Sequence, residues 1–461
     1  VVNINSGAGL VLDGRLNGGV TTGRRQLDAA PRGATLRIGE FSSSQGTFPD
    51  SQRIGNLTFR QQASDTLGAA FSLRTALTNA QRDTVSLGAL QVFGATQTTL
   101  DGSAETAFGT LELNTNGRIV VPAGVSLQAG VGSALTLRAP QIDIAGDIRL
   151  PAGNVTLRPV LPNSEPISPE LASATERVVV RSSATVSTAG EWINASNADG
   201  SFVGAPLPSG RRNADGSTST STIDGGGITI QITNPFFQTR LARGAVLDVS
   251  GGASIASNQR VSGGKGGLLS IANGTANQDT SDWLQAELRG HAIAAGGELS
   301  VNLARAVIDT DQANGLLSSF TTRLGTGLFS NAGFSRIAVT ATDGIEIVGG
   351  TTLVVRQTNL VVDQLAAKQL ATGGDLSGIS SRQVLPDSQR SAASVSLNAR
   401  GGGLPETGVL TLQAGASIRT DPGGEVTLSA ADALAVDGRI SAPGGRVGVT
   451  LSGSTALSAP D

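Results

Sequence analysis

The sequence predicts an all-β protein, a parallel β-helix (β-solenoid) interrupted by loop insertions. Short runs of alternating apolar and polar residues recur along the 461 residues, and Gly, Asn, Asp and Pro separate them. Such runs are typical of strands with one buried face, and the separating residues suit tight turns. Equivalent positions recur after about 20 residues, as from Leu137 to Leu157, which is the length of one coil with two or three short strands.

One series of residues occurs twice with identical spacing. An alternating pair is followed by Gly, Ile, Pro and Gly, and then by a second alternating pair. The first copy comprises Ile142, Ile144, Gly146, Ile148, Pro151, Gly153, Val155 and Leu157; the second comprises Leu434, Val436, Gly438, Ile440, Pro443, Gly445, Val447 and Val449. A looser third copy contains Leu111, Leu113, Gly117, Ile119, Pro122, Gly124, Val125 and Leu127. Reuse of strands and tight turns along a chain indicates stacked coils rather than a globular enzyme.

The predicted strands are short, and they are spaced evenly in most of the chain. In order, they are Leu10–Leu12, Thr35–Ile38, Leu57–Phe59, Leu111–Leu113, Leu135–Leu137, Val155–Leu157, Ile228–Ile232, Val246–Val249, Leu268–Ile271, Leu299–Leu303, Ile337–Val339, Ile345–Val348, Val409–Leu412, Val426–Leu428 and Val447–Leu451. Roughly 15 coils stacked about 4.8 Å apart would form a rod on the order of 70 Å long.

Three segments break this pattern: a short polar insertion from Ala272 to Glu287, and two longer segments that divide the chain into five parts. Residues 159–222 are rich in Pro, Ser and Asn, and residues 363–406 contain one predicted short helix from Gln364 to Leu370. We expect both to leave the rod as insertions. The parts are coils at 1–158, an insertion at 159–222, coils at 223–362, an insertion at 363–406 and coils at 407–461.

Composition excludes several classes of function. The chain has no Cys, so disulfides, thiolate metal sites and thiol catalysis are excluded. The net charge is −3 and no run of like charges occurs, so nothing points to nucleic acid as a partner. No run of 18 apolar residues predicts a membrane helix. The sequence begins and ends within the repeating pattern, at Val1 to Asn5 and Ser454 to Pro460, so we expect a segment of a longer protein.

The middle of the chain carries an ordered series of Gly-rich motifs. The series is Gly190–Asn194, Asp224–Ile230, Gly244–Gly252, Gly263–Ile271, Leu288–His291, Gly296–Val301 and Leu328–Ser335. It resembles the large exoproteins of the filamentous haemagglutinin family, which Gram-negative bacteria secrete by the two-partner route. The resemblance is densest between residues 188 and 360. The Asn-Pro-Asn-Leu-type signature of the family's secretion domain is missing, since Asn234-Pro235-Phe236-Phe237 differs from it.

This resemblance implies the shaft of an adhesin, without a catalytic centre. The implied fold is a right-handed β-helix, and the implied location is secreted and extracellular, on the cell surface. The implied partners are an outer-membrane two-partner secretion transporter and a host surface, neighbouring cell or glycan. End-to-end self-association into an extracellular filament is a variant. The alternatives are a polysaccharide-active β-helix enzyme, or a glycan-binding module in which the insertions at 159–222 and 363–406 contact the ligand.

The residue types needed for catalysis are sparse. His291 is the only histidine, and no nucleophile elbow adjoins it, so we expect a surface or turn histidine rather than a triad member. The glycines around Lys265 lack the Walker spacing, because Gln259 occupies the position of its first Gly and Gly266 that of its Ser or Thr. We expect a turn between coils there.

Three groups of oxygen-bearing side chains remain. Asn197–Ser201 and Asn213–Ser217 repeat one pentapeptide that could offer oxygens to Ca²⁺, but the EF-hand spacing is absent and Asx turns are favoured. Glu165 and Glu170 lie in a Pro-rich segment. Arg305, Asp309 and Asp311 lack a nearby aromatic platform, and we interpret them as a charged turn edge. We therefore predict no enzyme, no catalytic, cofactor-binding or metal-binding residue, and no cofactor.

Overall fold

A computed structural model supplies the structure of the chain. It describes residues 1–6, 10–12, 16, 18, 33–39, 54–61, 71–72, 74–93, 97–98, 104–105, 108–161, 169–196, 221–275, 282–313, 317–318, 320–402 and 407–453. Within these ranges the protein is all-β with large parallel sheets, so the coarse fold class predicted from the sequence is confirmed.

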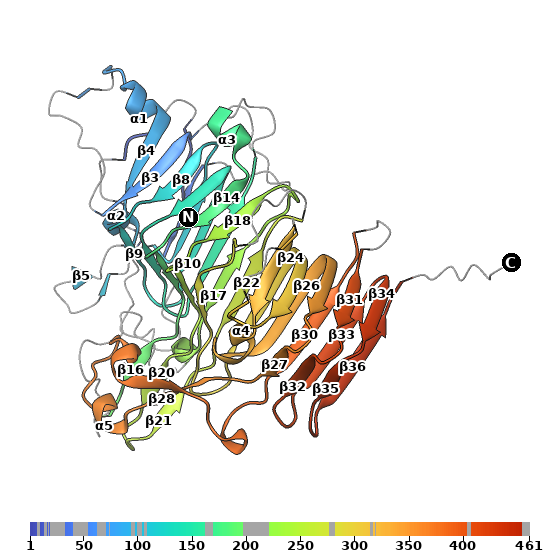
Figure 1. The fold of residues 1–461 in the computed structure, drawn as a ribbon. Helices are drawn as coiled ribbons and strands as arrows, with labels where there is room; N and C mark the ends of the chain where they lie inside the picture. Colours follow the sequence, from blue (N-terminus) through green and yellow to red (C-terminus); the bar gives the residue numbers. More distant parts are fainter. Residues whose placement is uncertain are drawn as a thin grey trace.

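The largest sheet within the described ranges has 15 strands, which pair in parallel (Figure 1). Its main path is β1 (Val2–Ile4), β2 (Thr35–Ile38), β7 (Thr110–Asn114), β10 (Ala134–Ala139), β13 (Asn154–Pro159), β17 (Gly227–Ile230), β22 (Leu268–Ala272), β24 (Gly297–Asp309), β26 (Phe334–Ile347), β30 (Ser394–Ala399), β33 (Glu425–Ala430) and β36 (Arg446–Leu451). The strands β25 (Thr321–Gly325), β31 (Val409–Leu412) and β34 (Ala433–Val436) join beside this path.

Three further parallel sheets receive the strands between those of the main path. One contains β18 (Gln238–Leu241), β14 (Glu176–Val180), β11 (Gln141–Ile144), β8 (Arg118–Val121), β3 (Asn56–Arg60) and β4 (Thr84–Gly88). A second contains β23 (Glu287–Arg289), β19 (Val246–Asp248), β15 (Thr185–Ser187), β12 (Asp147–Arg149) and β9 (Ser126–Gln128). The third contains β27 (Thr352–Val355), β32 (Ser417–Thr420) and β35 (Arg439–Ser441).

The remaining elements are short. Three pairs of strands are antiparallel: β20 (Ala253–Ile255) with β21 (Val261–Gly263), β28 (Asn359–Val362) with β29 (Ser380–Gln383), and β5 (Gln97–Thr98) with β6 (Ala104–Glu105). The strand β16 (Trp192–Asn194) pairs in parallel with β20. The helices are α1 (Asn79–Asp83), α2 (Ala89–Phe93), α3 (Pro169–Ser173), α4 (Gly327–Ser330) and α5 (Gln364–Ala367), with 3₁₀ turns at η1 (Ser221–Ile223), η2 (Leu376–Gly378) and η3 (Asp387–Gln389).

The chain returns to the same sheets in the same order. The strands β7, β8 and β9 are followed by β10, β11 and β12, and each strand of the second set pairs in parallel with its counterpart in the first. The sets β30–β32 and β33–β35 repeat this arrangement near the C-terminal end of the described chain. The registers join Leu137 to Leu157 and Val426 to Val447, the pairs that the sequence period predicts. This arrangement is compatible with the predicted solenoid.

Apolar side chains stack in columns that run across the large sheet. Leu113, Leu137, Leu157, Ile230 and Ile271 are register partners of one another in turn, and each is buried. The residue between the two apolar positions of each strand points outward. These outward residues also align from strand to strand, as Thr136, Thr156 and Thr229 do. The alternating pattern of the sequence therefore produces one continuous core.

Close backbone approach explains the glycines of the repeated series. A Cβ at Gly146 would lie 2.3 Å from the Val125 carbonyl oxygen, and one at Gly438 would lie 2.5 Å from that of Ala416. In both copies the carbonyl belongs to the adjacent coil, so the two glycines occupy equivalent corners. Glycine is required there because any side chain would clash with the neighbouring backbone.

The structure corrects the extent of both longer predicted insertions. Residues 176–194 within the 159–222 segment form β14, β15 and β16, which pair with strands of neighbouring coils. Residues 394–399 within the 363–406 segment form β30, which lies in the large sheet between β26 and β33. The first run escaped detection because Val178–Val180 is continuously apolar and does not alternate. The second run, Ser394–Ala399, does alternate, and the prediction of the insertion overlooked that signal. The short helix α5 begins at Gln364, as the sequence predicts.

Candidate functional site

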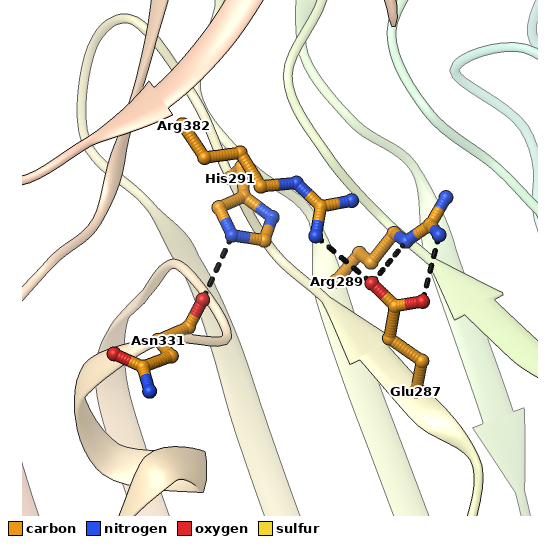
Figure 2. A network of polar contacts seen from close by, with 5 residues as sticks. All are labelled: Glu287, Arg289, His291, Asn331 and Arg382. Atoms are coloured by element: carbon orange, nitrogen blue, oxygen red, sulfur yellow. Dashed lines mark hydrogen bonds and ion pairs between the residues drawn. The ribbon is translucent and has the colours of Figure 1, made fainter.

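His291 lies immediately after β23 and is buried, with 2% of its surface exposed. The histidine lies in the connection after β23, in keeping with the predicted turn position, but it is not at the surface, because the segment that follows α4 covers the ring. The Nε2 atom lies 2.9 Å from the carbonyl oxygen of Asn331 (Figure 2). A carbonyl only accepts hydrogen bonds, so Nε2 carries the proton and Nδ1 keeps a lone pair. Within the described chain Nδ1 has no hydrogen-bond partner.

Burial lowers the pKa of His291, and the positive charge of Arg382 lowers it further. The neutral imidazole is therefore the stable form at neutral pH. The ring thus presents an acceptor at Nδ1, on the side of the ring that faces Arg382 in Figure 2.

Two arginines converge on Glu287 beside this histidine (Figure 2). Arg289 donates from Nε to one carboxylate oxygen at 2.8 Å and from Nη2 to the other at 2.7 Å. Arg382 on β29 donates from Nη1 at 2.9 Å, although it lies 95 residues further along the chain. The hydrogen bond from Arg289, aided by that from Arg382, lowers the pKa of Glu287 to about 2.

This network belongs to a column of polar residues on the outer face of the sheet β9–β12–β15–β19–β23. The column consists of Gln128, Arg149, Ser187, Asp248 and Arg289, which are register partners in turn. Alternation along each strand points these side chains away from the buried column of Leu127, Ile148, Val186, Leu247 and Leu288.

A groove of about 400 Å³ follows this column. Its floor is the column itself and its wall is the segment Gly373–Arg382, and His291 lies at one end. We call this the His291 groove. A second cavity of about 350 Å³, lined by Asp311, Arg323 and Leu328 among others, shares His291 and Arg382 with it.

The wall and the α5 segment that leads into it are anchored to coils that are distant in sequence, and within the wall the Gly373 amide donates to the Trp192 carbonyl at 2.9 Å. The Asn194 amide donates to the carbonyl oxygens of Ala367, Lys368 and Leu370 at 3.2, 3.1 and 2.8 Å. Trp192 donates from Nε1 to the Leu370 carbonyl at 2.9 Å, and its ring packs in a small core with Ala253, Ile255, Val362 and Ala367. Figure 1 shows α5 and β28 beside β16 and β20 accordingly.

The other candidate groups do not converge. Arg305 acts electrostatically on Asp343, Asp309 accepts a hydrogen bond from its neighbour Thr310, and Asp311 accepts from the Gly327 amide at 2.9 Å. The Lys265 amide donates to Asp224 Oδ1 at 2.7 Å in a packed turn. Glu170 lies in the first turn of α3.

Several predictions fall outside the described residues, namely Glu165, Asn197–Ser201 and Asn213–Ser217. In the part of the chain that the structure describes, no three His, Cys, Asp or Glu side chains are grouped so as to hold a metal ion. Over the same residues, no helix is long and apolar enough to cross a membrane.

No family model, curated protein or solved structure matches this chain significantly. The resemblance to filamentous haemagglutinin exoproteins rests on the motif series alone.

Acid should weaken the network around Glu287 in a defined pH range. Because its folded-state pKa of about 2 lies below the ordinary value of 4.5, the stabilisation is complete above pH 4.5 and is lost as the pH falls towards 2. Glu287 is substantially exposed, so we expect less than about 1 kcal/mol. Denaturant unfolding of Glu287→Gln should show a stability deficit against the wild type at pH 7 that is lost below pH 2. An equal deficit at both pH values would contradict this assignment.

Proposed function

We propose that this chain is a right-handed parallel β-helix that serves as a structural and adhesive shaft of a large secreted surface exoprotein of a Gram-negative bacterium. The observation that carries the proposal is the unbroken stacking of apolar columns from coil to coil across the large sheet. A core of this kind grows along one axis, so the fold builds length rather than a closed globule.

The motif series supports the secreted and surface-bound part of this proposal. Absence of Cys suits a chain that crosses an envelope unfolded, because no premature disulfide can form. The proposed export partner is an outer-membrane transporter of the two-partner type, and the proposed target is a host surface, a neighbouring cell or a glycan. We propose no enzymatic activity, and no contact among the described residues favours polysaccharide cleavage.

Location and adhesion can be tested on bacteria that produce the parent protein. Protease treatment of intact cells should release peptides of this chain, and deletion of its coding region should lower attachment to host cells or to neighbouring bacteria. Peptides that appear only after cell lysis would overturn the surface location, and unchanged attachment by the deletion strain would overturn the adhesive role.

The last coil of the described chain exposes apolar residues that continue the core columns. Val447 and Val449 pair with the buried Val426 and Leu428, yet they are 48% and 52% exposed. An uncovered coil end of this kind favours association with another strand edge. We therefore expect residues 1–461, studied as an isolated segment, to self-associate increasingly with concentration in analytical ultracentrifugation.

Val449→Lys should reduce this association, because it places a charge on the apolar end face. Thr450→Lys is the matched control, since its side chain belongs to the outward column of the same strand. A monomeric wild type at all concentrations, or equal association of both variants, would contradict end-to-end stacking.

A further inference from the structure

We propose that the His291 groove binds an uncharged polyhydroxylated ligand, a neutral oligosaccharide lying along the coil-stacking axis. This site rests on the proposed adhesive role, for which it would supply the glycan-binding surface, whereas the core of the shaft would stack equally well without it. The argument rests on the shape of the groove, its charge balance and the hydrogen-bonding capacity of His291.

The floor of the groove favours an elongated ligand. Gln128, Arg149, Ser187, Asp248 and Arg289 occupy one position on each of five successive strands. Neighbouring strands lie about 4.8 Å apart, so polar groups recur at short and regular intervals for nearly 20 Å. An extended chain of several sugar units matches such a series of hydrogen-bonding groups, whereas a compact ligand would use only one or two of them.

The charges of the groove disfavour an anionic ligand. Its lining includes three arginines, Arg149, Arg289 and Arg382, and three carboxylates, Glu191, Asp248 and Asp375. The formal sum of these six groups is zero, and the carboxylates of Glu287 and Asp147, which bind the three arginines, bring it to −2. Two of these arginines already bind Glu287, and Arg149 binds Asp147 at 3.4 Å. A polyanion would gain little Coulomb energy here and would meet the carboxylates at close range.

His291 identifies the kind of polar group that the ligand must carry. Nδ1 holds a lone pair and can accept only from a donor, whereas the adjacent Arg382 guanidinium, which already donates to Glu287, has further N–H groups that donate to an acceptor. A hydroxyl group supplies both at once. A carboxylate or phosphate supplies acceptors only and would leave Nδ1 unsatisfied, which is costly in a buried position.

Access to Nδ1 depends on the side chain of Arg382. The atom itself is covered in the structure, and the Arg382 side chain beside it is 45% exposed. A ligand hydroxyl can therefore reach Nδ1 only if this exposed side chain rotates away from the ring. The groove wall behind it is held by the bonds from Trp192 and Asn194, so most of the site is formed in advance.

Isothermal titration can test this site with defined probes. We would titrate cellohexaose, maltohexaose and xylohexaose as neutral probes, and hexagalacturonate as an anionic probe of equal length. We expect at least one neutral hexasaccharide to bind at sub-millimolar concentration and hexagalacturonate to bind at least tenfold more weakly. Failure of all neutral probes to bind at millimolar concentration, or preference for hexagalacturonate, would overturn the proposal.

Two variants locate the binding. Arg382→Ala and His291→Leu should each weaken the affinity at least tenfold, while Arg336→Ala should leave it unchanged, because Arg336 pairs with Glu298 on the large sheet, outside the groove. Circular dichroism identifies a variant that fails to fold, and Arg382→Ala removes only an exposed side chain. Equal weakening by Arg336→Ala, or none by Arg382→Ala, would overturn the assignment. Neither result bears on the proposed shaft, because circular dichroism reports its fold and analytical ultracentrifugation reports its self-association.

Discussion

Replacement of Leu137 by alanine should destabilise the coils around β10 by about 2–5 kcal/mol, the cost of a large-to-small change in a packed core. Leu137 is fully buried, and its register partners Leu113 and Leu157 stack on either side of it. Neighbouring coils cannot close the cavity without breaking their own backbone pairing. Native-state hydrogen exchange should therefore show faster opening of β7, β10 and β13, while distant coils change little because contacts are between neighbours.

Thr136→Ala is the matched control for that variant. Thr136 precedes Leu137 on the same strand and belongs to the outward column, so its replacement should change stability by no more than about 0.5 kcal/mol. A cost for Thr136→Ala equal to that for Leu137→Ala would contradict the assignment of the buried and outward faces.

The second large effect is expected at Asn194, which holds the wall of the His291 groove. Asn194→Ala removes the donor that serves the carbonyls of Ala367, Lys368 and Leu370. Loss of a buried partner costs about 1–3 kcal/mol, so the segment from Gln364 to Arg382 should open about 5- to 150-fold more often.

The chain offers a convenient readout because Lys265 and Lys368 are its only lysines. A lysine-specific protease should cut Asn194→Ala faster at Lys368, with Lys265 as the internal reference. Asn258→Ala is a matched control, since its Oδ1 accepts from the Arg260 amide in an exposed turn. Unchanged cleavage at Lys368 would show that Asn194 does not anchor the wall.

The local pattern of the coils could be predicted from the sequence, and the long-range docking could not. Alternation and the repeated glycine series indicated strands and corners, because each depends on contacts within one coil or with the next. The glycines at 146 and 438 illustrate this, since both avoid a carbonyl of the adjacent coil. The period of the sequence pattern defines neither the handedness of the coils nor their closure, so both belong to the proposed function.

The residues of the groove were missed for a different reason. Glu287 and Arg289 flank Leu288 with the spacing that places both on one outward face, which is a signal that the sequence contains. Arg382 carries no such signal, because it reaches Glu287 only after the segment containing α5 folds back onto β16. The burial of His291 likewise depends on α4 and Asn331, about 40 residues further along the chain.

The stacking of successive coils is the central claim, and paired cysteine substitutions test it directly because the natural chain has no Cys. Three pairs join the coil β7–β9 to the coil β10–β12, one in each sheet: Glu112 with Thr136, Arg118 with Gln141, and Gln128 with Arg149. Adjacent strands lie within the Cα separation that a disulfide spans. We expect all three double-cysteine proteins to form the disulfide under mild oxidation, as detected by mass spectrometry, whereas Glu112 with Thr156, two coils apart, should not. Disulfides in one sheet but not in the other two, or efficient closure of the Glu112–Thr156 pair, would contradict the stacked coils.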